Sequence, residues 1–328
     1  MPDYSFEQRV VAARPYIQRG MVDAALQAHP IYALLKSKGR VTAYEGRDIE
    51  VRVMYGKPKG VFYRDYDILP TTPTKILTKA IFEAAQLAVP VVMSGREMIE
   101  NSGETQQVDL LRTMIDGAKD SARDSVYDGI HSDGTGSGGK GIIGLKAIMP
   151  DDPTTGTYGG INRATSTWWR PGAYDISDGD IPGYTTLTKD TVLPILRAVM
   201  AKHTAGTAGP DLIVASTEFA EAVHDKLDAM QTVRTEGASA SLGFNTIKLN
   251  IGGRSVEFFE ESGIGSAMPA NTAYLIDIDS LALRYHKERN FVSDGQRKPL
   301  NQDATVEYML WMGQLVMDNG RHNAKITL

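Results

Sequence analysis

The sequence feature that most constrains the fold is a long stripe of apolar residues between positions 104 and 131. Its members are spaced by three or four residues, as on one face of an α-helix: Val108, Leu111, Ile115, Ala118, Ala122, Val126 and Ile130. Asp133-Gly134 then provides a stop signal. At about 1.5 Å per residue the helix would be roughly 40 Å long. We therefore expect a spine on which other parts of the chain lie.

Composition excludes several classes of protein. The chain has 328 residues and no Cys, so disulfides, thiolate metal sites and a cysteine nucleophile are ruled out. Lys plus Arg number 35 against 40 Asp plus Glu, and a net charge of −5 argues against broad binding to nucleic-acid phosphates. We see neither a signal peptide nor about 18 consecutive apolar residues, so a soluble protein made in a cytoplasm is expected.

A β-hairpin is predicted over residues 48–66. Apolar and polar residues alternate in 49–55 and again in 61–66, around a Gly/Pro-rich loop at 56–60. Lys57, Pro58 and Lys59 would form its tip. Because a two-stranded hairpin is barely stable by itself, a sheet should continue it or another molecule should cover it.

The rest of the chain predicts an α+β fold. Residues 1–38 suggest two helical pieces, the second ended by Pro30, and residues 75–99 fit either a strand or a helix. Residues 142–148 look strand-like. Helices are expected at 188–203 and 217–230, the latter with Ser216 or Thr217 as N-cap. Strands are expected at 211–216, 246–251, 255–260, 272–278, 281–287, 304–311 and 314–317.

The search for chemistry yields no catalytic residue, no metal site and no cofactor, so the chain is not expected to be an enzyme. Residues 134–141 match a phosphate-loop pattern, but a helix precedes them and Gly141 stands where a Ser or Thr would hold magnesium. A flexible linker is the better interpretation. The six His lack the spacing for joint metal ligation. Trp168-Trp169-Arg170 could stack on bases, but such clusters more often anchor a loop in a core or interface.

Two segments carry a resemblance to a known family. In Gly141–Arg170, a Gly-Leu after the long helix leads to a Gly-Thr-x-Gly-Gly-Ile-x-Arg run and then Trp-Arg. The second segment is Asn271–Phe291, followed by Thr305–Asn319. Together with the hairpin and the helix, they resemble the major capsid proteins of tailed bacteriophages, which have the Hong Kong 97 fold. The resemblance spans almost the whole chain.

The resemblance implies an α+β, Hong Kong 97-like organisation. It divides the chain into an N-terminal arm (1–39), an extended hairpin loop (40–74), a peripheral domain with the spine helix (75–141), an axial domain (142–284) and a return to the peripheral domain (285–328). The function implied is a subunit of the icosahedral virion capsid, assembled in the host cytoplasm.

The resemblance also implies partners. These are other copies in pentamers and hexamers, a portal protein, an optional decoration protein and packaged double-stranded DNA bound non-specifically, with no membrane. A separate scaffolding protein is expected because the arm and hairpin begin almost at Met1. The residues expected between subunits are Arg52, Lys57, Pro58, Lys59, Arg64, Trp168, Trp169 and Arg170.

Two alternatives stay open on the sequence. An encapsulin-like compartment subunit would share the fold and carry an inner-face pocket for cargo peptides. A soluble α/β enzyme would use residues 134–141 to bind phosphate, and calorimetry with a nucleotide would reveal it.

Overall fold

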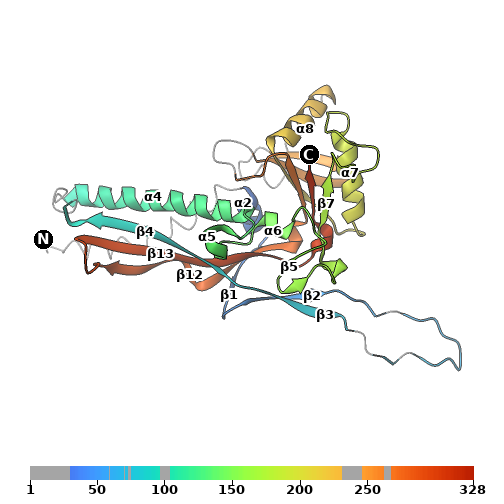
Figure 1. The fold of residues 1–328 in the computed structure, drawn as a ribbon, viewed down its shortest axis with the longest axis horizontal. Coiled ribbons are helices and arrows are strands. Elements are labelled where there is room, and N and C mark those ends of the chain that lie inside the picture. Colours follow the sequence, from blue (N-terminus) through green and yellow to red (C-terminus); the bar gives the residue numbers. More distant parts are fainter. Residues whose placement is uncertain are drawn as a thin grey trace.

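The structure is a computed structural model that describes residues 30–58, 60–69, 71–72, 75–96, 104–230, 246–261 and 267–328. It has an elongated part built on one long helix, a second part at one end, and a loop that projects away from both (Figure 1). The predicted N-terminal arm lies outside the described residues up to position 29. The division into arm, loop and domains stays a prediction.

The spine helix α4, Glu104–His131, has the predicted bounds. Ile115, Ala118, Ala122, Val126 and Ile130 of the predicted stripe are buried. The helix lies along a four-stranded sheet of order β1-β12-β13-β4 (Figure 1). The strands are β1 (Val41–Tyr44), β4 (Ala85–Ser94), β12 (Leu281–Arg297) and β13 (Ala304–Met317).

Strand β4 resolves the segment whose type the sequence leaves undecided. It pairs antiparallel with β13 along its whole length and has no second neighbour in the sheet order. Proline has no backbone N–H to donate to a neighbouring strand. A central strand has a neighbour on both sides, whereas an edge strand has one side without a partner and therefore tolerates Pro90. Its residues alternate between buried and exposed, as in a half-buried strand.

The predicted hairpin has a different second strand. β2, Ile49–Met54, pairs antiparallel with β3, Leu77–Phe82, and not with residues 61–66. Ile49, Val51 and Val53 are buried, as the alternation of this strand predicts. The prediction of a strand at 61–66 is wrong because those residues belong to a long irregular loop between β2 and β3.

The second part is a six-stranded sheet of order β7-β14-β11-β8-β10-β9. Its strands are β7 (Gly172–Asp175), β8 (Leu212–Ala215), β9 (Thr246–Ile251), β10 (Arg254–Glu260), β11 (Thr272–Ile276) and β14 (Ala324–Thr327). Helices α7, Val192–His203, and α8, Thr217–Met230, pack with one face of this sheet in a separate core. Its other face joins the core of the spine. The expected helices and strands of this region are confirmed, with small shifts in their bounds.

Short elements complete the fold. They are α2 (Pro30–Ser37), α5 (Gly136–Gly139), α6 (Leu145–Ile148), β5 (Thr157–Tyr158), β6 (Ile161–Asn162), η1 (Thr167–Trp169), η2 (Ile278–Ser280) and η3 (Gly320–His322). Among the described residues, none of the helices is both long and apolar enough to span a bilayer.

Two of these short helices were not expected from the sequence. Pro30 begins the helix α2, in keeping with the preference of proline for the first helical turn, and the helical piece expected before it lies outside the described residues. Residues 142–148 contain the helix α6 instead of a strand. Leu145 and Ile148 lie three residues apart and are both buried, which is a helical spacing.

Candidate intersubunit surface

The most exposed apolar surface of the described chain lies on the projecting loop between β2 and β3 (Figure 1). The hydrogen-bond ladder between β2 and β3 continues one residue pair beyond the strands, where the Tyr55 amide donates to the Ile76 carbonyl. Further along, the side chains of Phe62, Tyr66 and Ile68 are 104, 100 and 97% exposed. Large apolar side chains that are wholly exposed and close together mark an interaction surface.

The predicted loop residues occupy different places on this projection. Arg52 is exposed on β2. Lys57 and Pro58 are exposed but follow directly after the ladder, so they lie at the base of the loop and not at its tip. Arg64 lies in the middle, in a turn where its backbone amide donates to the Asp67 carboxylate at 2.9 Å. Lys59 lies outside the described residues.

A second exposed apolar patch lies on the four-stranded sheet. Val92, Val292 and Tyr308 are 47, 46 and 40% exposed. The strand register places Tyr308 opposite Pro90 and Val292 opposite Leu310, so these residues share one face. The other face, with Val89 and its neighbours, packs in the core against the spine helix. Sequence reasoning missed this patch, because residues 304–311 carry apolar side chains on both faces of the strand.

Trp168, Trp169 and Arg170 form a junction inside the chain. Trp169 is completely buried, and its Nε1 donates to the Tyr158 carbonyl at 3.0 Å. Trp168 is partly exposed, and its ring stacks on Tyr55 with centroids 5.0 Å apart. Arg170 donates to the Arg163 carbonyl at 2.6 Å. Because Trp169 is inside the core of the chain, it is not available for a contact between subunits.

The Gly-Thr-x-Gly-Gly-Ile-x-Arg run has a structural explanation. Gly159 and Gly160 connect β5 to β6, and both have positive φ angles, 59° and 75°. Such a turn favours glycine at both positions. The Arg163 guanidinium is buried and donates to the Ala147 and Ile148 carbonyls at 3.2 and 2.7 Å. The run thus ties the end of α6 to the β5–β6 hairpin and to the tryptophans.

The Gly-rich run 134–141 does not have the geometry of a phosphate loop. It follows α4 and leads to α6, and between them α5 is only four residues long. The Asp133 carboxylate accepts from the Thr135 amide at 3.0 Å and from its hydroxyl at 2.6 Å, and these bonds hold the pKa of Asp133 below its usual value. An ionised carboxylate already occupies an amide that a phosphate would need, and it would repel the phosphate.

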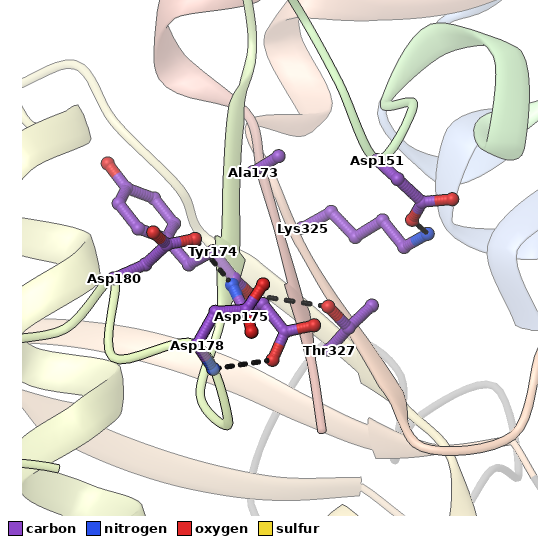
Figure 2. Close-up of a pocket in the computed structure, with 8 residues that line it drawn as sticks. All are labelled: Asp151, Ala173, Tyr174, Asp175, Asp178, Asp180, Lys325 and Thr327. Carbon is purple, nitrogen blue, oxygen red and sulfur yellow. Dashed lines mark hydrogen bonds and ion pairs between the residues drawn. The ribbon is translucent and has the colours of Figure 1, made fainter. Parts of the chain in front are cut away.

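A cavity of about 350 Å³ lies beside β7 and β14 (Figure 2). Its lining includes the ion pair between buried Lys325 and Asp151. Asp175 accepts from the Ser177 hydroxyl and backbone amide at 2.6 and 2.8 Å, and its own amide donates to Asp180 at 2.9 Å. These carboxylates therefore hold a local turn together. None of the residues predicted for the site lies in this cavity, and within the described ranges no three His, Asp or Glu are grouped as metal ligands.

Comparisons with known proteins identify the fold. No protein-family model and no curated protein matches the sequence. Among solved structures, the capsid asymmetric unit of cyanophage A-1(L) aligns with a TM-score of 0.64 at 16% identity, over 88% of this chain and 90% of that one. The capsid of a native GTA particle gives 0.54 at 12% identity, over 90 and 89%. A virus-like particle from Pyrococcus furiosus gives 0.52 at 9% identity, over 95 and 98%. The chain has the α+β, Hong Kong 97-like capsid fold.

Proposed function

We propose that this protein is the major capsid protein of a tailed bacteriophage, which assembles with copies of itself into the icosahedral head around double-stranded DNA. Its place would be the virion capsid, and its role would be structural. The observation that carries the proposal is the projecting loop, whose Phe62, Tyr66 and Ile68 are almost wholly exposed on the single chain. The capsid fold of the solved neighbours supports it.

The loop and the sheet patch suit each other as two halves of one contact. Both are apolar, and both remain exposed, the sheet patch in part, in the portion of the chain that the structure describes. Two apolar surfaces that are removed from water together stabilise an assembly by about 25 cal/mol per Å² buried. We propose that the loop of one subunit lies on the sheet patch of the next. Arg52, Lys57, Pro58, Lys59, Arg64, Trp168 and Arg170 would flank this contact.

The other partners follow from the same role. A separate scaffolding protein and a portal protein would take part in assembly, and a decoration protein could be added to the finished shell. Packaged DNA would be held weakly and without sequence preference, because the chain carries a net charge of −5. An encapsulin-like compartment is the second candidate, since its subunits would have the same fold. The gene neighbours would separate the two, being portal and terminase genes in one case and an enzyme gene in the other.

Single substitutions in the loop test the proposed contact. Phe62→Asp and Tyr66→Asp each place a charge on an exposed site, so the fold should be unaffected while docking on an apolar patch should fail. Leu300→Asp is the matched control, because Leu300 is 102% exposed in the turn between β12 and β13, outside both surfaces. We expect shells from the wild type and from Leu300→Asp in electron micrographs, and few or none from the loop variants. Normal shells from all three variants would contradict the contact.

A further inference from the structure

The β2–β3 ladder carries the projecting loop and packs on the rest of the molecule, with Val51 and Val53 of β2 buried. One contact marks each end of this packed stretch. At the inner end, the Ile81 amide donates to the Gly159 carbonyl at 3.0 Å, and the Phe82 ring lies 4.9 Å from the Tyr158 ring. At the outer end, the Tyr55 ring stacks on Trp168, with centroids 5.0 Å apart and an angle of 23° between the planes. The two attachments differ in strength.

The inner attachment is tightly packed. Phe82 and Tyr158 are both buried. Gly159 has a φ of +59°, and a Cβ built on it would lie 2.7 Å from Phe82 Cζ and 2.9 Å from the Ala80 Cβ. The turn between β5 and β6 therefore touches β3 with no space between them. This contact can act as a fixed point for the ladder.

The outer attachment is a single pair of rings near the surface. Tyr55 is 37% exposed, and Trp168 is only partly buried. Ile49 pairs with Phe82, so Tyr55 lies six residues further along the ladder, or about 20 Å at ~3.4 Å per residue. Val53 is the last buried residue of β2 before Tyr55, so the stacked rings lie where the ladder leaves the core. Separation of the rings would free the direction of the loop beyond them.

We propose that the Tyr55–Trp168 stack is a latch that fixes the direction in which the loop leaves the body. Tyr55 and Trp168 are then positioning residues, and the packed ladder between Phe82 and Val53 is the fixed base from which the loop leaves. The latch itself follows from the single chain. Its effect on assembly rests on the proposed function, because only a docking loop needs a fixed direction.

Tryptophan fluorescence tests the latch in the unassembled full-length chain. The protein has three Trp, of which Trp169 and Trp311 are buried, so Trp168 alone should be open to a soluble quencher such as acrylamide. Tyr55→Ala removes the ring that covers it, and we expect a higher quenching constant and a red-shifted emission. Tyr63→Ala is the control, because Tyr63 is an exposed tyrosine further along the same loop. Equal quenching in Tyr55→Ala and the wild type would overturn the latch.

Assembly tests the positioning role. Tyr55→Ala should give shells of mixed size or open fragments, whereas Tyr55→Phe keeps a stacking ring and should restore uniform closed shells. The unfolding temperature of each variant shows whether its fold is intact. Uniform shells from Tyr55→Ala, despite increased quenching, would overturn the positioning role. Failure of the wild type to assemble would instead contradict the proposed function, and the quenching result would still decide the latch.

Discussion

At the scale of the residue, hydrogen bonds fix the protonation of His203 at the end of α7. Its Nδ1 lies 2.6 Å from the Arg321 carbonyl oxygen, which can only accept, so Nδ1 carries the proton. Its Nε2 then accepts from the Tyr174 hydroxyl at 2.9 Å. Burial lowers the pKa of His203, because the charged form loses hydration. The folded chain therefore holds a neutral His203.

This arrangement predicts a loss of stability in mild acid. The unfolded chain binds a proton at His203 near pH 6.5, the ordinary pKa of His, whereas the folded chain binds it only at a lower pH. The free energy of unfolding should fall as the pH drops below about 6.5 towards the lowered pKa. His203→Gln removes this titration. Melting temperatures at several pH values should show a steeper acid decline for the wild type, and parallel curves for the two proteins would refute the assignment.

A second feature at this scale explains the Gly-Leu that follows the long helix. A Cβ on Gly144 would lie 2.3 Å from both the Gly129 and the Ile130 carbonyl oxygens at the end of α4. Only glycine can approach the helix backbone so closely. The sequence pattern identified this residue by resemblance, but its physical reason is visible only in the fold.

Substitution of Gly144 should therefore destabilise the protein. Gly144→Ala forces backbone atoms apart, and overpacking of this kind typically costs about 1–3 kcal/mol. Gly136→Ala is the control, because a Cβ there meets nothing within 4 Å and the φ angle is not positive. Urea unfolding should show a lower midpoint for Gly144→Ala alone. Equal midpoints for the two variants would show that the close approach is not real.

At the scale of the element, the sequence predicted those helices and strands in which apolar residues recur at a single regular spacing and face the core. The stripe on α4 predicted its bounds because one face of the helix is buried from Ile115 to Ile130. β2 was predicted by its alternation. Its partner β3 was not, because the pairing closes a loop of more than twenty residues and the exposed run 61–66 alternates in the same way. Periodicity reports which residues share a face, but it does not report which distant segment pairs with them.

The candidate surface was predicted in the same partial way. The beginning of the loop could be located because the alternation in β2 is followed by the Gly/Pro-rich run, whereas its end at β3 carried no such signal. The sheet patch could not be located, because Val92 and Val292 come from segments that meet only through the register of three strands. Trp169 and Trp168 are neighbours in sequence with opposite surroundings, and only the fold distinguishes the buried ring from the partly exposed one.

The loop can be removed without removing its strands. Tyr55 bonds to Ile76, so Gly56 and Lys75 are the next positions on the ladder, and an Asn-Gly turn in place of residues 57–74 would close it. A deletion of 48–66 would instead remove β2 and its buried side chains. We expect the shortened protein to be folded, with a circular dichroism spectrum and melting temperature close to those of the wild type, but to stay unassembled. Shells from the shortened protein would show that the loop is dispensable.

At the scale of the whole molecule, the chain has two cores and an apolar projection that neither core covers. The chain has no Cys, so no disulfide can hold an assembly together, and burial of apolar surface between subunits would contribute to its strength. A net charge of −5 is compatible with a shell that encloses DNA without binding it tightly. These properties suit a subunit whose surface is completed by copies of itself.

Negative-stain electron microscopy of the purified full-length protein, concentrated alone and with the proposed scaffolding protein, is the most direct test of self-assembly. We expect rings of five or six subunits and closed shells of icosahedral outline. Particles that stay single and compact at every concentration, with and without the partner, would contradict it.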